Sequence, residues 1–388
     1  MLRQVVSITA VNLLSIGRRW GSTLTMLIGV AAASGVFAGM HAFIAGFDDS
    51  LTGGARDIRA IVLGDGARDG GDSYLTDEHI RAISVADGIE KTASGEPMMT
   101  RDAFVSITMT SKEDNQPHGV VVAAYSSALL RVRPEIHVIE GRMFAPGQRE
   151  AIVGKQTRMQ FHHAAIGDDI PLESGNVRIV GVFESGFWAD SCVLMDVDVL
   201  LDEYKRVGSN MVTARLTSPP AIDALKSSLA TNASLRFQVI TEPEYYVRFR
   251  GTFSVFDNVA DVVGAMMALG AVFCALNAMY TSVAARQREI AIVRAMGFTT
   301  PSIVVSVVVE SVLVSAAGAS LGVLMAWLFF DGLTVTTGTY LMSVIHSVDV
   351  SRSVIYQSML WACAIGLVGA LWPSLQAARQ PVSRALGR

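Results

Sequence analysis

The sequence is poor in charge and in cysteine. Only 17% of its 388 residues are Asp, Glu, Lys or Arg, against roughly 25% in typical soluble domains, whereas 51% are hydrophobic. The net charge of −4 provides no basic surface of the kind that binds nucleic acid, so we expect no nucleic-acid partner. The three cysteines have neither the number nor the spacing of a disulfide framework or a zinc site.

Motifs for chemistry are also missing. Gly154 and Lys155 are followed by Gln156 where a nucleotide-binding Walker A loop needs Ser or Thr. His162 and His163 are adjacent and have no third ligand at metal-binding spacing. Neither a Gly-x-Ser-x-Gly nor a His-Glu-x-x-His pattern occurs. We therefore predict that the chain is not an enzyme and has no catalytic residue, metal site or cofactor of its own.

Four long apolar segments are present instead. A helix needs about 20 apolar residues to cross a bilayer, and a buried soluble helix of that length would show a polar stripe. The four segments that lack Asp, Glu, Lys and Arg are Trp20–Phe47, Val262–Ala285, Ser311–Phe330 and Ser353–Ala378. The first is about twice as long as the apolar core of a signal peptide, which favours a retained helix. We predict transmembrane helices at 20–47, 262–285, 301–330 and 353–378.

The distribution of basic residues predicts the orientation, because Lys and Arg of short flanks stay on the cytoplasmic side. Basic residues outnumber acids before the first helix, between the second and third, and after the fourth, at Arg3, Arg18, Arg19, Arg286, Arg288, Arg294, Arg379, Arg384 and Arg388. The loop 331–352 has two aspartates and a single arginine. We predict a multi-pass protein of the bacterial inner membrane, with segments 1–19, 286–300 and 379–388 cytoplasmic and segments 48–250 and 331–352 outside.

The segment 48–250 is long enough for a folded α+β domain. Its patterns predict a strand and a helix first, then several β-type runs, and finally a strand, a helix and a strand. The predicted strands are Arg59–Gly64, Phe104–Thr110, Gly119–Tyr125, Ala151–Val153, Val177–Phe183, Met211–Leu216 and Phe237–Thr241, and the helices are Thr76–Ala86 and Pro220–Leu229. This order indicates a split βαβ-type module with an inserted β-rich lobe at about 105–190.

The loop after the second span has the pattern of a short amphipathic helix that Gly297 ends, before a new helix begins at Pro301. Such a helix suits docking into a groove of a cytoplasmic partner, and an anchor in the lipid headgroups is an equally open interpretation. The residues that we assign to ATPase coupling are Arg286, Arg288, Glu289, Ile290, Arg294 and Gly297.

Two further features concern the spans. Glu310 lies about 13 Å along the third span from Pro301 at 1.5 Å per residue, and an ionisable side chain there is expected to face the bundle interior. Small residues recur at every fourth position, including Gly264 with Ala268 and Gly318 with Gly322. They predict close helix packing, either within the chain or at a subunit interface.

The segment after the second span, the tail and the layout of the spans resemble the MacB/FtsX-like permease family of ABC transporters. The family has an Arg-Glu-Ile-Gly-x-x-Arg-Ala-Leu-Gly signature, and the matching segment here is Arg288-Glu289-Ile290-Ala291-Ile292-Val293-Arg294-Ala295-Met296-Gly297. It departs at Ala291 and Met296. The tail is similar to the family's Pro-x-x-x-Ala-Ala-Arg-x-x-Pro-Val-x-Ala-Leu ending, from Pro373 to Leu386, with one extra residue at Ser383-Arg384.

The resemblance implies a non-catalytic permease subunit that works as a homodimer or heterodimer with a separate ABC ATPase, which binds the ATP. It also implies that ATP-driven motion passes through the coupling helix to the periplasmic domain, often with a periplasmic adaptor and an outer-membrane channel, for export or efflux. Two alternatives within the family stay open: regulation of a periplasmic cell-wall hydrolase, as in FtsX, and release of lipoproteins.

Overall fold

The computed structural model describes residues 9, 20–231, 235–251, 254–339 and 342–379. The predicted cytoplasmic segments 1–19 and 379–388 therefore lie almost entirely outside the described residues. The chain forms two compact units. One, the helical bundle, comprises Met1–Ala45, Val255–Leu333 and Ser347–Arg388; the other, the mixed α/β domain, comprises Gly46–Ser254 and Thr334–His346.

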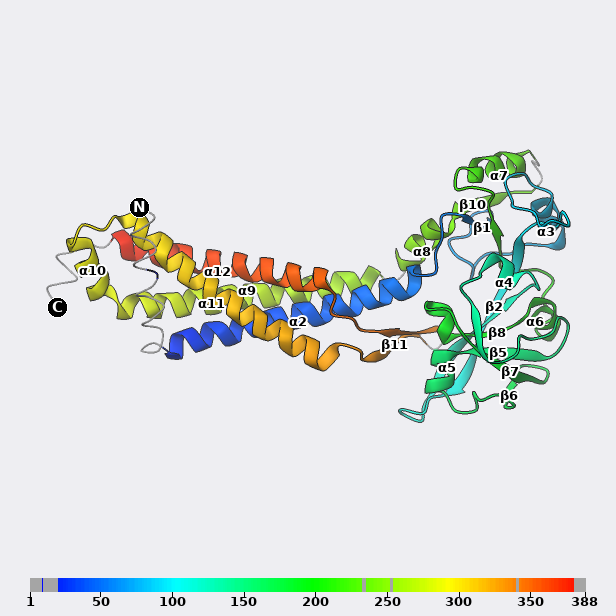
Figure 1. The fold of residues 1–388 in the computed structure, drawn as a ribbon, viewed down its shortest axis with the longest axis horizontal. Coiled ribbons are helices and arrows are strands. Elements are labelled where there is room, and N and C mark those ends of the chain that lie inside the picture. Colours follow the sequence, from blue (N-terminus) through cyan, green and yellow to red (C-terminus); the bar gives the residue numbers. More distant parts are fainter. Residues whose placement is uncertain (1–8, 10–19, 232–234, 252–253, 340–341, 380–388) are drawn as a thin grey trace. The chain divides into compact units, whose positions relative to one another are not determined.

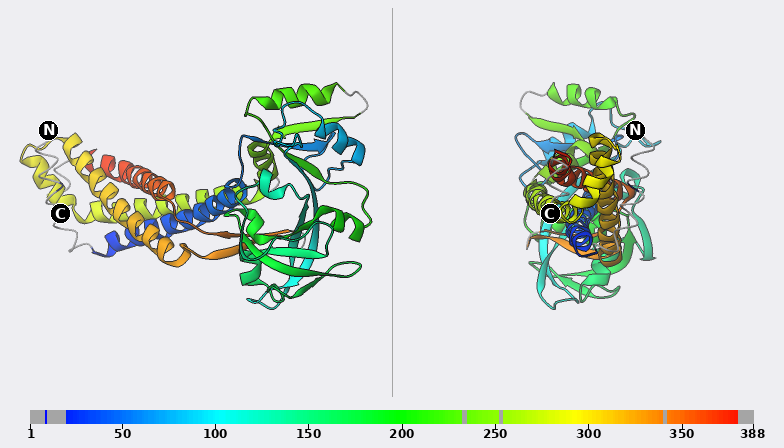
Figure 2. Two further views of the ribbon diagram at one scale, coloured as in Figure 1. Left: turned by 45° about the vertical axis from the view of Figure 1, so that its right-hand side comes forward. Right: turned by 90° about the vertical axis from the view of Figure 1, so that its left-hand side faces the viewer.

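Four helices of the described chain are long and apolar enough to cross a membrane. They are α2 (Trp20–Thr52), α9 (Ser254–Ala285), α11 (Thr300–Phe330) and α12 (Arg352–Arg379). They run side by side in the bundle (Figures 1 and 2), and apolar side chains from all four meet in one core. The short helix α10 (Gln287–Ala295) joins α9 to α11. The predicted set of four spans is thus present as four packed helices.

Small residues bring α11 against α2 within this bundle. A Cβ atom on Gly318 would lie 2.9 Å from the carbonyl oxygen of Leu27, and one on Gly322 would overlap the carbonyl oxygen of Ala31. Side chains as small as a single hydrogen let the two backbones approach closely, which is the main source of helix association in lipid. The spacing of Gly318 and Gly322 therefore serves contacts within the chain.

Replacing Gly322 with alanine is expected to destabilise the bundle by about 1–3 kcal/mol, because the added methyl group meets backbone that must move. Gly270 in α9 is the matched control, since nothing lies within 4 Å of the position that its Cβ would occupy. Gly270→Ala should be neutral or slightly stabilising. Unfolding by SDS in mixed micelles measures both variants, and equal midpoints would contradict the packing argument.

One sheet of ten strands runs through the described part of the mixed α/β domain. Its first four strands have the order β10-β1-β9-β2, with every neighbouring pair antiparallel. They are β1 (Arg59–Gly64), β2 (Met99–Thr110), β9 (Met211–Arg215) and β10 (Phe237–Thr241). The helices α3 (Asp77–Ser84) and α7 (Ala221–Ala230) pack on one face. This confirms the predicted split βαβ-type module.

The side-chain alternation of β1 explains how the module is layered. Ala60 and Val62 pack in the core beneath α3 and α7, whereas Ile61 and Leu63 belong to the core on the other face. Successive residues of a strand point to opposite faces, so a strand buried on both faces is apolar throughout. Thr76 caps α3: its hydroxyl accepts from the backbone N–H of His79 at 3.5 Å, and the backbone N–H of Thr76 donates to Nδ1 of His79 at 3.3 Å.

The inserted lobe shares a strand with the module. Met99–Asp102 of β2 pair with β9, and Asp102–Thr110 pair with β3. The remaining lobe strands are β3 (Pro117–Tyr125), β4 (His137–Gly141), β5 (Glu150–Gly154), β6 (Asp169–Pro171), β7 (Asn176–Glu184) and β8 (Val193–Asp196). Its short helices are α4 (Leu129–Val132), α5 (Lys155–Gln160), a 3₁₀ turn at Trp188–Ser191 and α6 (Val197–Glu203). The lobe thus begins inside a strand and extends past residue 190.

Several elements were not predicted, including the shorter strands and helices of the lobe. Two more lie outside the lobe: the helix α8 (Glu242–Gly251), which follows β10 directly, and a hairpin of β11 (Thr334–Thr339) and β12 (Met342–Ser347) in the segment 331–352, which the sequence indicated only as a short loop. The hairpin strands are short and rich in Thr and Ser, so they lack the apolar alternation that marks a strand in sequence.

Candidate functional site

The connection between α9 and α11 is a compact, well-bounded helix. Gly297 has φ +92°, its N–H donates to the carbonyl of Arg294 at 3.0 Å, and the N–H of Phe298 donates to that of Val293 at 3.3 Å. This pair of bonds is a Schellman motif, which requires a residue in the left-handed region and so favours glycine. Pro301 lies in the first turn of α11. Gly297 therefore ends α10 as the sequence predicted.

One side of α10 packs on the bundle and the other is exposed. Ala291 is buried, and Ile290 packs against the bundle core. Arg288 and Glu289 are exposed, and Ile292 and Met296 beside them are 45% and 64% exposed. Of the predicted coupling residues, Ile290 therefore faces inward, whereas Ile292 and Met296, which were not in that set, lie on the exposed side. The sequence alone could have indicated this exposed apolar pair, because Ile292 and Met296 are four residues apart and so lie on one face of a helix.

Arg286 and Glu310 form a buried ion pair inside the bundle. Nη2 of Arg286 lies 2.8 Å from Oε2 of Glu310 and 3.3 Å from Oγ of Ser282. The two charged side chains are only 5% and 3% exposed. This confirms that Glu310 faces the bundle interior and identifies its partner. Arg286, which the sequence assigned to ATPase coupling, has its side chain turned inward, where it ties the end of α9 to α11.

A second buried charge cluster lies in the mixed α/β domain. Glu242, the first residue of α8, is fully buried and bridges two arginines. Its Oε2 lies 2.6 Å from Nε of Arg59 and its Oε1 lies 2.6 Å from Nη1 of Arg133. Glu135 pairs with Arg59 at 2.7 Å, and the backbone N–H of Arg56 donates to Glu242 at 3.0 Å.

This cluster, which we call the Glu242 cluster, joins the segment after α2 to the start of α8. Those segments lie near the start and the end of Gly46–Ser254, the longer of the two stretches of chain that form the domain. Sequence reasoning missed it, although an arginine at the start of a strand as apolar as β1 was a detectable signal. Buried charges persist only when they are paired, so the cluster fixes the geometry of these two segments.

Asp102 lies near the same cluster, where β2 passes from the module to the lobe. Burial raises the pKa of its carboxyl group to about 7; the charge of Arg133 opposes the shift, as do hydroxyl hydrogen bonds from Thr100 and Thr213, and the charge of Glu242 adds to it. The native state therefore holds this proton more tightly than the unfolded chain, in which an Asp titrates near 3.9. The stability that the proton confers is present at acidic pH and is lost as pH rises through about 7.

Asp102→Asn, which mimics the protonated form, is expected to remove this pH dependence. The melting temperature of the wild-type chain should fall relative to that of the variant between about pH 5 and pH 8. Thermal unfolding across this range tests it, with Asp198→Asn as control because Asp198 forms an exposed ion pair with Arg101. A constant difference between the wild type and Asp102→Asn would contradict the assignment.

No group of three His, Cys, Asp or Glu side chains in the described ranges is placed to hold a metal ion. Within the described residues the arrangement comprises a capped helix α10 with an exposed face, a buried ion pair behind it, and the buried Glu242 cluster.

The chain is similar to known protein families and to a known transporter. Residues 20–232 match the family model of the MacB-like periplasmic core domain, and residues 262–382 match the FtsX-like permease C-terminal model. The macrolide export ATP-binding/permease protein MacB of Shewanella sp. (strain ANA-3) is 24% identical over an alignment of 294 residues, which covers 68% of this chain. The chain spans 44% of that relative.

This chain is also similar to a solved structure, the extracellular domain of the noncanonic ABC-type transporter YknZ from Gram-positive bacteria. The alignment covers 47% of this chain and all of the YknZ domain, at 16% identity and a TM-score of 0.35.

Proposed function

This chain belongs to the MacB/FtsX-like permease family of ABC transporters, and we propose that it couples ATP hydrolysis by an ABC ATPase subunit to a conformational change of its mixed α/β domain. In this proposal the chain lies in the bacterial inner membrane, with α10 and both termini cytoplasmic and the mixed α/β domain periplasmic. The excess of arginine at one set of short flanks supports this orientation.

The observation that carries the proposal is the form of α10. It is a helix of nine residues with a capped end and a mixed apolar and charged outer face, and it is packed on the bundle through Ala291 and Ile290. An amphipathic helix of this kind suits a groove in a partner. An anchor in lipid headgroups would need neither the Schellman end nor the buried Arg286–Glu310 pair behind it.

The helix α2 is suited to carry motion from the bundle to the mixed α/β domain. It is a single helix from Trp20 to Thr52. Its residues Met26 and Val30 belong to the bundle core, and Phe47 and Leu51 belong to the core of the mixed α/β domain. A continuous helix transmits displacement along its axis because its backbone hydrogen bonds resist stretching. We propose that motion imposed on α10 reaches the domain through α2.

We propose that this conformational change drives export. The proposed partners besides the ATPase are a second permease copy and, for efflux across both membranes, a periplasmic adaptor and an outer-membrane channel. The name of the Shewanella relative supports the export branch. Co-purification of a cell-wall hydrolase without an adaptor would favour the FtsX-like alternative instead. Accumulation of unreleased lipoproteins on depletion would favour the lipoprotein alternative.

Arg288→Glu is expected to reduce transport at least tenfold and to abolish co-purification of the ATPase, because it reverses a charge on the exposed face of α10. Arg352→Glu is the matched control, since it makes the same change at an exposed position at the start of α12. Affinity purification of the co-expressed complex and its ATPase rate measure the effect. If Arg288→Glu kept the ATPase bound at wild-type level, α10 would not be the docking site.

A further inference from the structure

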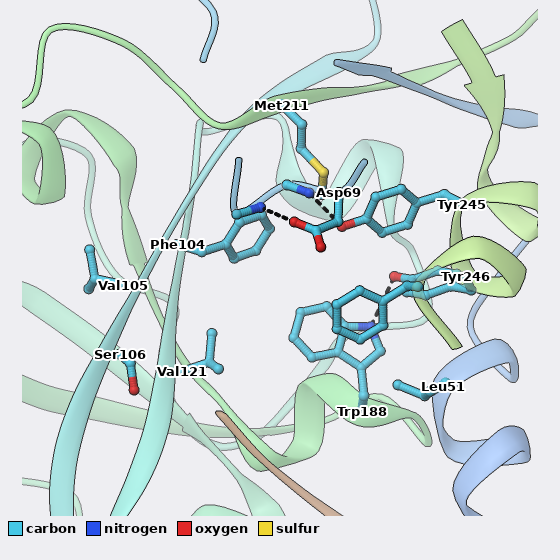
Figure 3. Close-up of a pocket in the computed structure, with 13 residues that line it drawn as sticks. Leu51, Asp69, Phe104, Val105, Ser106, Val121, Trp188, Met211, Tyr245 and Tyr246 are labelled. Carbon is cyan, nitrogen blue, oxygen red and sulfur yellow. Dashed lines mark hydrogen bonds between the residues drawn. The ribbon is translucent and has the colours of Figure 1, made fainter. Parts of the chain in front are cut away.

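A pocket lined by aromatic rings lies within the mixed α/β domain (Figure 3). Its volume is about 220 Å³. The aromatic residues that line it are Phe104, Trp188, Tyr245, Tyr246 and Phe249. They come from β2, which the module and the lobe share, from the 3₁₀ turn of the lobe, and from α8. Ser106, on the same face of β2 as Phe104, is exposed at the edge of the pocket.

The walls of the pocket are held in place by hydrogen bonds at the tips of the rings. Nε1 of Trp188 donates to the hydroxyl of Tyr246 at 2.9 Å. The hydroxyl of Tyr245 accepts from the backbone N–H of Gly70 at 3.2 Å, and the carbonyl of Gly70 accepts from the side chain of Asn210 at 2.6 Å. The polar ends of these rings are thus satisfied by the protein, and the rings line the pocket.

The charge of the lining has one sign. Among the thirteen lining residues Asp69 is the only carboxylate, and none is Lys, Arg or His. Asp69 is half-buried in the turn that it caps, where its Oδ1 accepts from the N–H of Gly71 at 2.6 Å. Figure 3 shows its carboxylate directed between Phe104 and Tyr245. Asp69 is also among the charges that raise the pKa of Tyr245, for which burial is the main cause, as expected for close neighbours.

We propose that this pocket binds a small organic cation, with the ammonium group at Asp69 and its apolar body against Trp188 and Tyr246. Aromatic faces attract cations through their quadrupoles, and a carboxylate beside them adds direct charge complementarity. The volume is below the roughly 300–1,000 Å³ of pockets that enclose a drug-sized ligand, so it fits a single ring bearing an ammonium group, or that end of a larger molecule. The site is a property of the domain alone and does not depend on the proposed coupling.

Benzyltrimethylammonium is the probe that tests this site, in the full chain reconstituted in nanodiscs. We expect saturable binding by isothermal titration calorimetry and a change in Trp188 fluorescence, because Trp188 is the sole tryptophan between residues 46 and 254. Benzyl alcohol and benzenesulfonate, the neutral and anionic counterparts, should bind at least tenfold more weakly. Trp188→Phe should abolish the fluorescence change while leaving heat of binding detectable.

Asp69→Asn should weaken binding of the cation at least tenfold, since an asparagine oxygen can still cap the turn but has no charge. Asp72→Asn is the matched control: it removes the same charge from the same loop, and Asp72 does not line the pocket. Equal affinity for the three probes, or equal effects of the two variants, would overturn the proposal. Absence of saturable binding by the wild-type chain up to about 10 mM would do so as well.

Discussion

Replacing Glu242 with glutamine is expected to destabilise the mixed α/β domain by about 3–5 kcal/mol. Glu242 is fully buried and is paired at 2.6 Å with both Arg59 and Arg133, which are themselves 2% and 1% exposed. Removing its charge leaves two buried guanidinium groups with Glu135 as the remaining carboxylate of the cluster. Since a buried charge without a partner has lost its hydration and gained nothing in return, the loss falls on the folded state alone.

Glu244, two residues later in α8, provides the matched control. It pairs with Arg248 at 2.6 Å, but the two side chains are 44% and 41% exposed. Surface pairs of this kind contribute about 0–1 kcal/mol, so Glu244→Gln should have little effect. Chemical unfolding followed by tryptophan fluorescence reports on this domain in both variants when the Trp188 signal is taken as the part that Trp188→Phe removes. Equal destabilisation by the two substitutions would show that the Glu242 cluster does not anchor α8.

Replacing Glu310 with glutamine is expected to destabilise the helical bundle by about 2–5 kcal/mol. The substitution leaves Arg286 charged and buried at the end of α9, beside the hydroxyl of Ser282. Because the pair joins α9 to α11 directly behind α10, we also expect α10 to lose its fixed position. SDS unfolding in mixed micelles measures the stability of the bundle, and hydrogen exchange over 287–295 measures the position of α10.

A double substitution distinguishes the loss of the pair from the creation of a lone charge. Arg286→Met combined with Glu310→Leu removes both charges at similar volume, so its stability should return close to the wild-type value. Arg288→Gln is the control for removing a positive charge at the same end of the bundle, since Arg288 is exposed. A double variant as unstable as Glu310→Gln would indicate that side-chain shape at these positions matters more than charge.

Much of the architecture was predictable because it depends on local patterns. The four spans follow from the lengths of apolar runs, and the structure has helices at all of them. The end of α10 at Gly297 follows from the need for a left-handed residue, and the cap of α3 at Thr76 follows from hydrogen bonding within one turn. The split βαβ-type module followed from the order of strands and helices, and sheet pairing in the structure agrees with it.

The candidate site was only partly predictable, because burial of a charge is decided by distant residues. Arg286 and Arg288 look alike in the sequence, but one turns inward and the other outward because they lie at different angles around the helical connection. The Glu242 cluster unites residues separated by 183 positions in the chain, which no local pattern can register. The aromatic pocket depends in the same way on contacts between β2, the 3₁₀ turn and α8.

The sequence by itself determined which segments can span a membrane, where α3 begins and α10 ends, and the family to which the chain belongs. These properties depend on hydration of side chains and on hydrogen bonds within a few residues. Only the tertiary structure decided that Glu310 pairs with Arg286, that Gly322 packs on Ala31, and that Asp69 lies beside a pocket of aromatic rings. Side-chain partners are set by the three-dimensional packing of whole elements, and that packing minimises the exposure of apolar surface and the burial of lone charges over the entire chain.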